Sequence, residues 1–461
     1  MRAVIEAARR AVDATLAAGA SDAEAYAGED AGREVRVHGG EVESLTAATR
    51  RGAGVRAWIG RRAGYAHGTD LSAAGLAGLA GRAAAAARVA DEDEFAGPPE
   101  LPVRSVPDME GESAEAGALE LSDRSLAATP TAEVAELALE IERAALAADP
   151  RIAGVEQAVY ADSAERVAIV SSTGIAGEYE RSTCHAYVQT LAESDGGRET
   201  GLGFGLGRGP AALDPAAIGR EGAERAAAMI GAGKPGSREC PVLLDPTVAA
   251  SFVALVGRGL CADAVQRGRS PFAGRRGERL AGEALVLRDD GLDPAGHASS
   301  PFDGEGVPRR STTLIEGGEL RAHLYDTYAA RRDGTGSSGN AGRGGYRSRP
   351  SVSASNLVVA AGRLGSAELL REAGEGVLVT DVAGLHSGVN PVTGVFSVGA
   401  SGHAIRGGEV AEPLREFTIA SDLVSMLGAV RAAGAERRWV PFGGSVQAPA
   451  LLIEAMTVAG S

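Results

Sequence analysis

Lysine is almost absent from this sequence. Lys234 is the only lysine among 46 basic residues, and the others are all arginine. A Schiff base, a Walker-type phosphate loop and a serine–lysine dyad each need a lysine side chain, so all three would depend on this one residue. It lies in Gly233-Lys234-Pro235-Gly236, a sequence typical of a turn. These three classes of chemistry are therefore excluded.

Cysteines and long apolar runs are also scarce. The three cysteines, Cys184, Cys240 and Cys261, lie far apart and form no C-x-x-C pair. This spacing fits neither a disulfide framework nor a zinc ribbon, and it indicates free thiols in a reducing compartment. No apolar run is long enough for a membrane span, and the first residues do not resemble a signal peptide. We therefore expect a cytoplasmic protein without a membrane segment.

Basic residues are fewer than acidic residues, 46 against 61. The formal net charge is −15 at pH 7, and no cluster of basic residues stands out along the sequence. An acidic chain repels the phosphate backbone of DNA or RNA. Nucleic-acid binding is therefore excluded as a general function.

The length and the order of predicted elements indicate two domains. A chain of 461 residues is longer than a single ordinary domain. A turn-like stretch at 231–237 predicts a linker, which gives an N-terminal domain at 1–235 and a C-terminal domain at 236–461. Helices and strands do not alternate regularly, so the predicted class is α+β. We expect a helix-plus-β-meander domain followed by a β-rich domain with few helices.

In the N-terminal half, apolar spacing and glycine-rich turns predict the elements. The expected turns of the meander are His38-Gly39-Gly40 and Gly60-Arg61, and Thr129 is the expected N-cap of a helix. Gly201, Gly203, Gly205, Gly207 and Gly209 alternate, which predicts a strand with one face open to a closely packed helix or backbone. The predicted helices are 3–18, 71–90, 130–149 and 214–230, and the predicted strands lie within 23–67 and 152–208.

In the C-terminal half, two Gly-Gly pairs predict hairpin turns. They are Gly317-Gly318 and Gly407-Gly408. The other predicted elements are strands at 242–244 and 450–453 and helices at 246–260 and 421–434.

The histidines and serines of the sequence do not form the motifs that are typical of catalytic sites. No two of the seven histidines are three, four or five residues apart, so no helix presents a ready pair of imidazoles. A metal site built from distant segments stays open as an alternative. No serine lies in a complete G-x-S-x-G elbow, which disfavours serine hydrolysis.

The densest group of candidate residues lies between Ser300 and Arg347. Asp303 and Glu305 stand two residues apart between glycines, which predicts that both face one side of an extended loop. Paired carboxylates perform acid–base chemistry, but Asp-Gly and Glu-Gly also form ordinary turns, and both interpretations stay open. Tyr325 and Asp326 follow, and the glycine-rich loop Gly334–Gly345 is predicted to close over a ligand or a partner.

Several segments along the chain form a recognisable set of motifs. They are Pro301-Phe302-Asp303-Gly304-Glu305-Gly306-Val307, Leu324-Tyr325-Asp326-Thr327-Tyr328-Ala329-Ala330-Arg331, Gly388-Val389-Asn390-Pro391-Val392-Thr393-Gly394-Val395-Phe396-Ser397-Val398-Gly399-Ala400-Ser401-Gly402, Gly54-Val55-Arg56, Gly64-Tyr65-Ala66, Asp70-Leu71 and Thr457-Val458-Ala459-Gly460. Together they resemble the TldD/PmbA family, and the resemblance extends over essentially the whole chain. One departure is Val395, where the family usually has an acidic residue before Phe396-Ser397.

Within this family, the sequence resembles the TldE (PmbA) branch. In the TldD branch a helix carries H-E-x-x-x-H, and a cysteine near the C-terminus completes a metal site. The corresponding positions here begin with Val253 and Ala254 and end with Arg258, and no cysteine follows Cys261. The resemblance therefore implies a chain that has no catalytic residues and no metal of its own.

The resemblance also implies a function. Members of this kind pair with a TldD-like subunit that holds zinc, and the heterodimer hydrolyses unfolded peptides, as in leader-peptide removal or peptide degradation. Two alternatives stay open: a self-associating protein with a biosynthetic role and acid–base chemistry from Asp303 and Glu305, and a binding or regulatory module. The candidate residues for a peptide cleft or a subunit interface are Asp303, Glu305, Tyr325, Asp326, Asn390 and Arg258.

Overall fold

Two large β-sheets with helices packed against them form the protein. The computed structural model describes residues 2–100, 119, 121–194, 197–441 and 444–460. The first sheet is built from residues 22–207 and the second from residues 238–459. This arrangement confirms the α+β class. The predicted division between 235 and 236 falls in the connection between the sheets and stays a prediction.

The first sheet has six antiparallel strands in the order β3-β2-β1-β4-β5-β6. The predicted turns at Gly39-Gly40 and Gly60-Arg61 are confirmed, because each lies between two paired strands. The strands are much longer than the short segments we predicted, since glycines such as Gly28 and Gly52 lie inside strands rather than between them. The six strands are β1 (Asp22–His38), β2 (Glu41–Ile59), β3 (Arg62–Gly68), β4 (Ile152–Ser171), β5 (Ala176–Ser194) and β6 (Gly197–Gly207).

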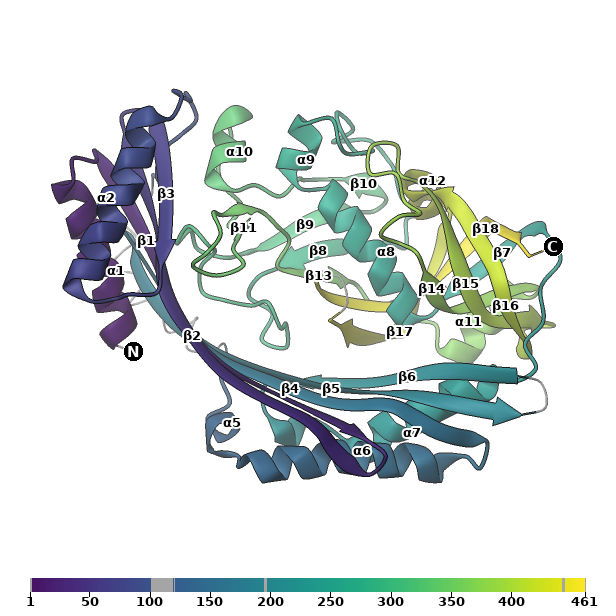
Figure 1. Cartoon of the computed structure of the whole chain (residues 1–461). Coiled ribbons are helices and arrows are strands. Elements are labelled where there is room, and N and C mark those ends of the chain that lie inside the picture. The colour runs from purple at the N-terminus through teal and green to yellow at the C-terminus, as the bar shows by residue number, and fades with distance from the viewer. Residues whose placement is uncertain (1, 101–118, 120, 195–196, 442–443, 461) are drawn as a thin grey trace.

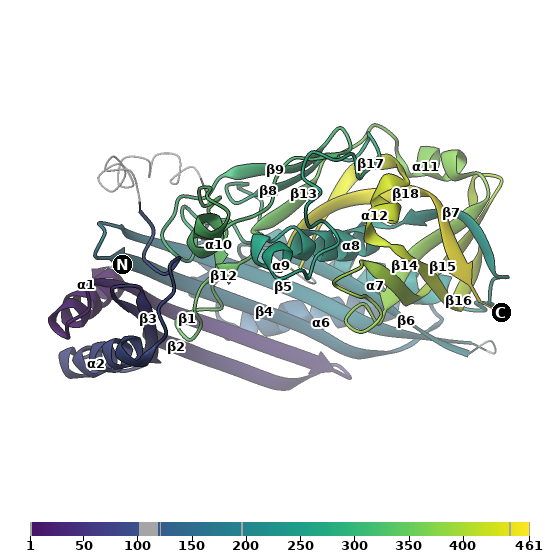
Figure 2. The same ribbon diagram turned by 90° about the horizontal axis from the view of Figure 1, so that it is seen from above.

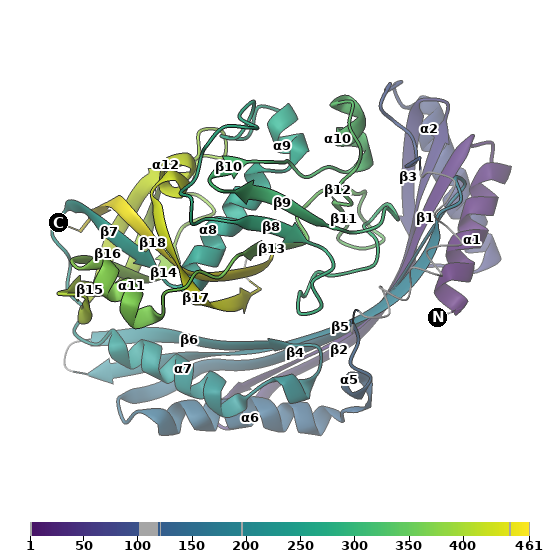
Figure 3. The ribbon, with the colours of Figure 1, turned by 180° about the vertical axis from the view of Figure 1, so that it is seen from behind.

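Helices cover the outer face of this curved sheet, and the C-terminal half lies on its inner face (Figure 1). The helices α1 and α2 cover one end, and α6 and α7 cover the other (Figure 3). Two separate apolar cores lie beneath these pairs of helices. The helices of this half are α1 (Arg2–Ala17), α2 (Ala73–Val89), α5 (Ser125–Ala128), α6 (Thr131–Ala148) and α7 (Pro215–Ala228), with a 3₁₀ turn η1 (Pro210–Ala212).

One predicted cap is wrong. Thr129 does not begin α6: it ends the short helix α5, and its hydroxyl donates a hydrogen bond to the carbonyl of Ser125. The N-cap of α6 is Pro130, which makes no side-chain cap bond. The Thr-Pro pair therefore separates two helices, because proline fixes the backbone at the start of the second one.

The alternating glycines of β6 bring α7 close to the sheet, as predicted. A Cβ atom added at Gly201 would lie 2.2 Å from the carbonyl oxygen of Gly222, and one at Gly203 would lie 2.1 Å from that of Ile218. No real side chain tolerates such a distance. The bare face of β6 is therefore required by the helix backbone, and no ligand is needed to explain it.

The second sheet has ten strands, most of them antiparallel, and it lies over the long strands of the first sheet (Figure 2). Because β18 pairs with both β16 and β7, the strands β18, β16, β15, β14 and β7 close into a ring. The strands are β7 (Arg238–Leu244), β8 (Leu287–Asp290), β9 (Ser311–Glu316), β10 (Glu319–Leu320), β13 (Asn356–Val359), β14 (Gly376–Ala383), β15 (Val395–Arg406), β16 (Glu409–Asp422), β17 (Val430–Val440) and β18 (Ser445–Ala459); β11 (Ala341–Gly342) and β12 (Ser351–Val352) form a separate pair.

Both Gly-Gly hairpins are confirmed, but one predicted helix is not. The segment 421–434 contains only the short helix α12, and β17 begins at Val430. β17 is paired along its length with β18, so strand pairing overrides the helix preference of its alanines. The helices of this half are α8 (Pro246–Gly259), α9 (Ala262–Gln266), α10 (Thr327–Arg332), α11 (Ser366–Ala373) and α12 (Leu423–Gly428).

The outer part of β2 is a free sheet edge. β3 pairs with β2 only from Ala53 to Ile59. Residues 41–51 are all exposed, and apart from β1 no strand in the described part of the chain pairs with them. Their backbone N–H and C=O groups on this side can therefore accept a further strand.

Candidate functional site

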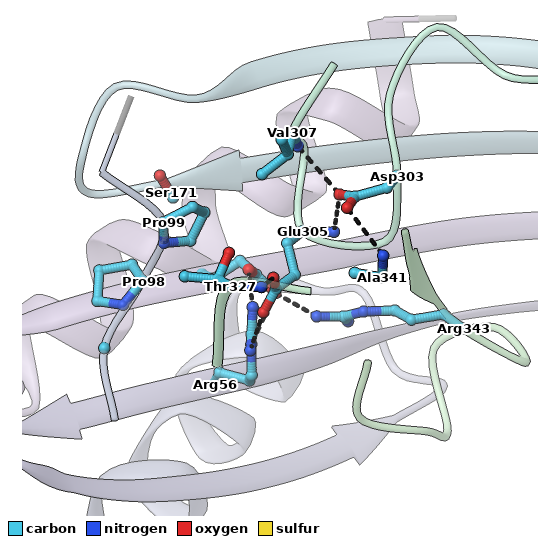
Figure 4. A network of polar contacts seen from close by, with 12 residues as sticks. Arg56, Pro98, Pro99, Ser171, Asp303, Glu305, Val307, Thr327, Ala341 and Arg343 are labelled. Atoms are coloured by element: carbon cyan, nitrogen blue, oxygen red, sulfur yellow. Dashed lines mark hydrogen bonds and ion pairs between the residues drawn. The ribbon is translucent and has the colours of Figure 1, made fainter. Parts of the chain in front are cut away.

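Four buried charged residues join the two halves of the molecule. Glu24 on β1 and Arg56 on β2 are cross-strand neighbours, while Glu305 and Arg343 come from loops of the C-terminal half. Arg56 Nη1 lies 2.8 Å from Glu305 Oε1, and Arg56 Nε lies 3.0 Å from Glu24 Oε1. Arg343 also pairs with Glu24. The chain of ion pairs therefore runs from Glu305 through Arg56 and Glu24 to Arg343. Figure 4 shows Arg56, Glu305 and Arg343 in this network.

This network is almost completely shielded from water. The Glu24 side chain is 0% exposed, and those of Glu305 and Arg343 are 2% exposed. Burial disfavours the charge of Arg56, yet Glu24 and Glu305 together raise the pKa of its guanidinium. Each charge depends on its partner, because an unpaired ion in this environment is strongly destabilising.

Asp303 organises the loop that carries Glu305. Its Oδ1 atom accepts hydrogen bonds from the backbone N–H groups of Glu305 (2.8 Å) and Val307 (3.0 Å), and its Oδ2 atom accepts one from Ala341 (2.9 Å). The loop is a tight turn in which Gly306 has φ +81°. The segment is therefore a turn rather than an extended loop, and its two carboxylates have different partners (Figure 4).

The pKa values of this carboxylate pair move in opposite directions. Burial and the charge of Glu305 raise the pKa of Asp303 to about 7. Burial would also raise the pKa of Glu305, but Arg56 and the N–H of Thr327 lower it below its ordinary value. A carboxyl group that titrates near neutrality suits acid–base chemistry. Here, however, both oxygens of Asp303 are engaged by backbone amides, so the geometry favours a structural role.

Tyr325 and Asp326 lie beside this pair but have their own structural partners. Asp326 is the N-cap of α10, and its Oδ1 atom accepts a hydrogen bond from Ala329 N at 2.7 Å. The hydroxyl of Tyr325 donates to Asp333 at 3.0 Å. Burial and the Glu305 carboxylate raise the pKa of Asp326 to about 6.

This raised pKa predicts a specific pH dependence of stability. The pKa of Asp326 is about 6 in the folded protein and about 3.9 in an unfolded chain. The folded state therefore holds the proton more tightly, and this contribution is present below about pH 4 and is lost as the pH rises through 6. Asp326→Asn keeps an N-cap residue but cannot titrate.

We expect wild type to lose stability relative to Asp326→Asn by on the order of 2 kcal/mol between about pH 4 and pH 7. Urea unfolding of both proteins across this range measures the difference. Parallel stability curves for the two proteins would contradict the assignment.

The glycine-rich loop Gly334–Gly345 packs onto the same region. Asn340 donates hydrogen bonds to the carboxylate of Asp289 and to the carbonyl of Ser353, and Ala341 N donates to Asp303. These contacts attach the loop to the site. Closure of the loop over a ligand stays a prediction.

Asn390 and Arg258 lie apart from these residues. Asn390 is exposed and stabilises its own turn, because its Oδ1 atom accepts hydrogen bonds from Val392 N and Thr393 N. Arg258 is exposed near the end of α8 and borders a pocket of about 140 Å³ together with Cys261. It makes no ion pair with any described residue.

The α8 positions that correspond to H-E-x-x-x-H do not fit a metal ion. Val253 and Ala254 are buried apolar side chains, and Arg258 carries a positive charge. In the part of the chain that the structure describes, no group of three or more histidine, cysteine, aspartate or glutamate side chains is arranged to hold a metal. A zinc site needs three such ligands, so the donor set near α8 is not that of a metal centre.

Glu24 and Arg343 are the members of the network that the sequence did not reveal. Glu24 lies in no motif that distinguishes it from the other acidic residues of the chain. Arg343 lies in the glycine-rich loop Gly334–Gly345, but nothing in the sequence distinguishes it within that loop. The segment Gly54-Val55-Arg56 did indicate Arg56, although without its partners. Only the pairing of β1 with β2 identifies Glu24 as the carboxylate beside Arg56.

Three family models match the chain in succession. The models described as PmbA/TldA metallopeptidase domain 1, central domain and C-terminal domain match residues 23–87, 124–230 and 237–460, respectively. No helix in the described residues has both the length and the apolar character needed to cross a membrane.

Similar proteins match this chain over nearly its whole length. Metalloprotease PmbA of Escherichia coli O157:H7 is 28% identical over 96% of this chain and 94% of its own length. The metalloprotease PmbA homolog of Haemophilus influenzae is 26% identical over 98% of this chain and 95% of its own length. A crystal structure from Thermotoga maritima, described as a candidate modulator of a DNA gyrase, has a TM-score of 0.87 at 25% identity and covers 98% and 99% of the two chains. TldE from Thermococcus kodakarensis has the same fold, with a TM-score of 0.86 at 21% identity. The match covers 98% of this chain and 100% of the TldE chain.

Proposed function

Because the chain belongs to the TldD/PmbA (TldE) family of metallopeptidase-like proteins, we propose that it is the non-catalytic subunit of a two-chain metallopeptidase. In this proposal a TldD-like partner subunit supplies the zinc ion and the general base. The assembly hydrolyses unfolded peptides in the cytoplasm.

The observation that carries this proposal is the chemistry of α8. A zinc peptidase needs three ligands and a base to activate water. The corresponding face of α8 presents Val253 and Ala254, which cannot bind a metal or accept a proton, and Arg258, whose charge would repel a cation. Arg258 also has no carboxylate partner in the described part of its own chain, which leaves it available for an ion pair with the partner subunit.

The free edge of β2 supports a peptide as the substrate. An unfolded peptide has unpaired backbone N–H and C=O groups, and it can add to a sheet edge as a further strand with little regard for its side chains. Residues 41–51 offer such an edge, with all side chains exposed. A folded protein has few free backbone groups to pair with this edge, so this mode of binding favours unfolded peptides.

Co-expression with a TldD-type chain tests the proposed assembly. With an affinity tag on one subunit only, we expect both chains to elute together at moderate salt. We also expect the isolated chain to contain far less than one zinc per molecule after dialysis. Failure of the chains to co-elute, or stoichiometric zinc in the isolated chain, would contradict the proposal.

A further inference from the structure

A cavity of about 480 Å³ lies between the inner face of the first sheet and the loops of the C-terminal half. Its walls include Tyr26 and Arg181 from the sheet and Arg309 and Arg349 from the C-terminal half. A second pocket of about 520 Å³ is adjacent to it and is lined in part by the same residues, including Tyr26 and Arg343.

The first cavity has an excess of positive charge, although the whole chain is acidic. Four arginines line it, against the carboxylates of Glu165 and Asp303. Glu165 is paired with Arg181 at 2.6 Å, and Asp303 is engaged by backbone amides. Arg309 and Arg349 make no ion pair with a described residue. Arg309 is near enough to Asp303 to lower the pKa of that carboxyl, and its Nη1 atom donates to the carbonyl of Gly339 at 2.8 Å. Even so, arginines outnumber carboxylates in the cavity wall by four to two.

Arg343 adds hydrogen-bond donors that have no acceptor. Its side chain is 2% exposed, and its only carboxylate partner among the described residues is Glu24, which it shares with Arg56. Its Nε and Nη1 atoms are buried and have no hydrogen-bond partner among the described residues. Buried donors without partners are rare in native proteins because each one costs free energy. The guanidinium carbon lies 5.1 Å from the centre of the Tyr26 ring. A ligand in this cavity that carries hydrogen-bond acceptors would give these donors the partners that they lack.

The rest of the lining is mixed, with the hydroxyl groups of five serines beside a smaller apolar group. Val167, Ile169 and Phe302 lie in the same cavity as the arginines, together with the aromatic rings of Tyr26 and Tyr179. These side chains pack against one another as one apolar cluster that forms part of the cavity wall. A carboxylate attached to an apolar group satisfies both kinds of surface, since guanidinium groups form paired hydrogen bonds with carboxylates.

We propose that this cavity binds a peptide through a carboxylate, held by three of the arginines that line it, Arg309, Arg343 and Arg349. The source of the carboxylate is the C-terminus of the peptide, whose last side chain occupies the apolar part of the cavity. This inference rests on the proposed function for its choice of a peptide ligand. The site belongs to this chain alone, so binding does not require the partner subunit.

Three fluorescently labelled pentapeptides test the site on the isolated full-length chain. The first ends in leucine with a free carboxylate, the second is its C-terminal amide, and the third is the amide with a glutamate before the leucine. We expect the amide to bind about tenfold more weakly than the free acid, because it loses a charge-assisted hydrogen bond. The third peptide distinguishes a side-chain carboxylate from the terminal one, and binding as tight as the free acid would overturn the terminal assignment.

Single substitutions identify the arginines. Arg309→Gln and Arg349→Gln are each expected to weaken binding of the free acid about tenfold and to leave binding of the amide unchanged. Arg310→Gln, a neighbouring exposed position that does not line the cavity, is the matched control. These variants are preferred to a change at Arg343, which would disturb the buried network. Equal affinity for acid and amide, no detectable binding, or no effect of either substitution would overturn the proposal, whatever the outcome of co-elution.

Discussion

Glu24→Ala is expected to lower the free energy of unfolding by about 3–5 kcal/mol. The Glu24 side chain is fully buried between two guanidinium groups, those of Arg56 and Arg343. Removing it leaves Arg343 without a carboxylate partner among the described residues, and Arg56 with Glu305 alone. Urea unfolding of both proteins at the same pH measures the difference.

A control on the same strand separates this effect from a general loss of charge. Glu34 is also on β1, but its side chain is 51% exposed and its ion pair with Arg36 spans 3.7 Å. Glu34→Ala is expected to change the stability by less than about 1 kcal/mol, as is usual for exposed pairs. Similar losses for the two variants would show that the buried network is not what stabilises the contact between the halves.

Gly203→Ala is expected to cost about 1–3 kcal/mol, although it adds only one methyl group. The new Cβ atom would lie 2.1 Å from the carbonyl oxygen of Ile218 in α7, so the helix has to move away from β6. Thermal unfolding should show a clear decrease in Tm relative to wild type.

Gly154 provides the matched control for this substitution. It is also a strand glycine, but a Cβ atom added there meets no other atom within 4 Å. Gly154→Ala is therefore expected to leave Tm unchanged or to raise it slightly, since alanine restricts the unfolded chain. If both variants lost the same stability, close packing of α7 could not be the reason for the glycines in β6.

Local signals predicted most elements of the fold correctly. The Gly-Gly pairs at 317–318 and 407–408 form hairpins because both residues of each pair adopt positive φ. Asp214-Pro215 begins a helix because the aspartate side chain accepts a hydrogen bond from Ala217 N. The failure at 421–434 has the opposite cause: β17 is a strand because β18 is beside it, and the local sequence contains no trace of that pairing.

The candidate site was predictable only where its residues are close in sequence. Asp303, Glu305 and Asp326 were found because they lie in one glycine-rich region. Glu24 was not found, and simple counting from the Gly39-Gly40 turn would have failed, because a bulge between Arg36 and Val37 shifts the register of the hairpin by one residue. Because of this shift, Glu24 lies opposite Arg56. Without it, Glu24 would lie opposite Val55.

Hydrolysis of an unfolded peptide, measured for each subunit alone and for the two together, tests whether this chain is the non-catalytic half of a metallopeptidase. We expect this chain alone not to cleave the peptide, with or without added zinc. We expect cleavage when a TldD-type partner is added, and we expect a chelator to abolish it. Chelator-sensitive cleavage by the isolated chain would contradict the proposed function.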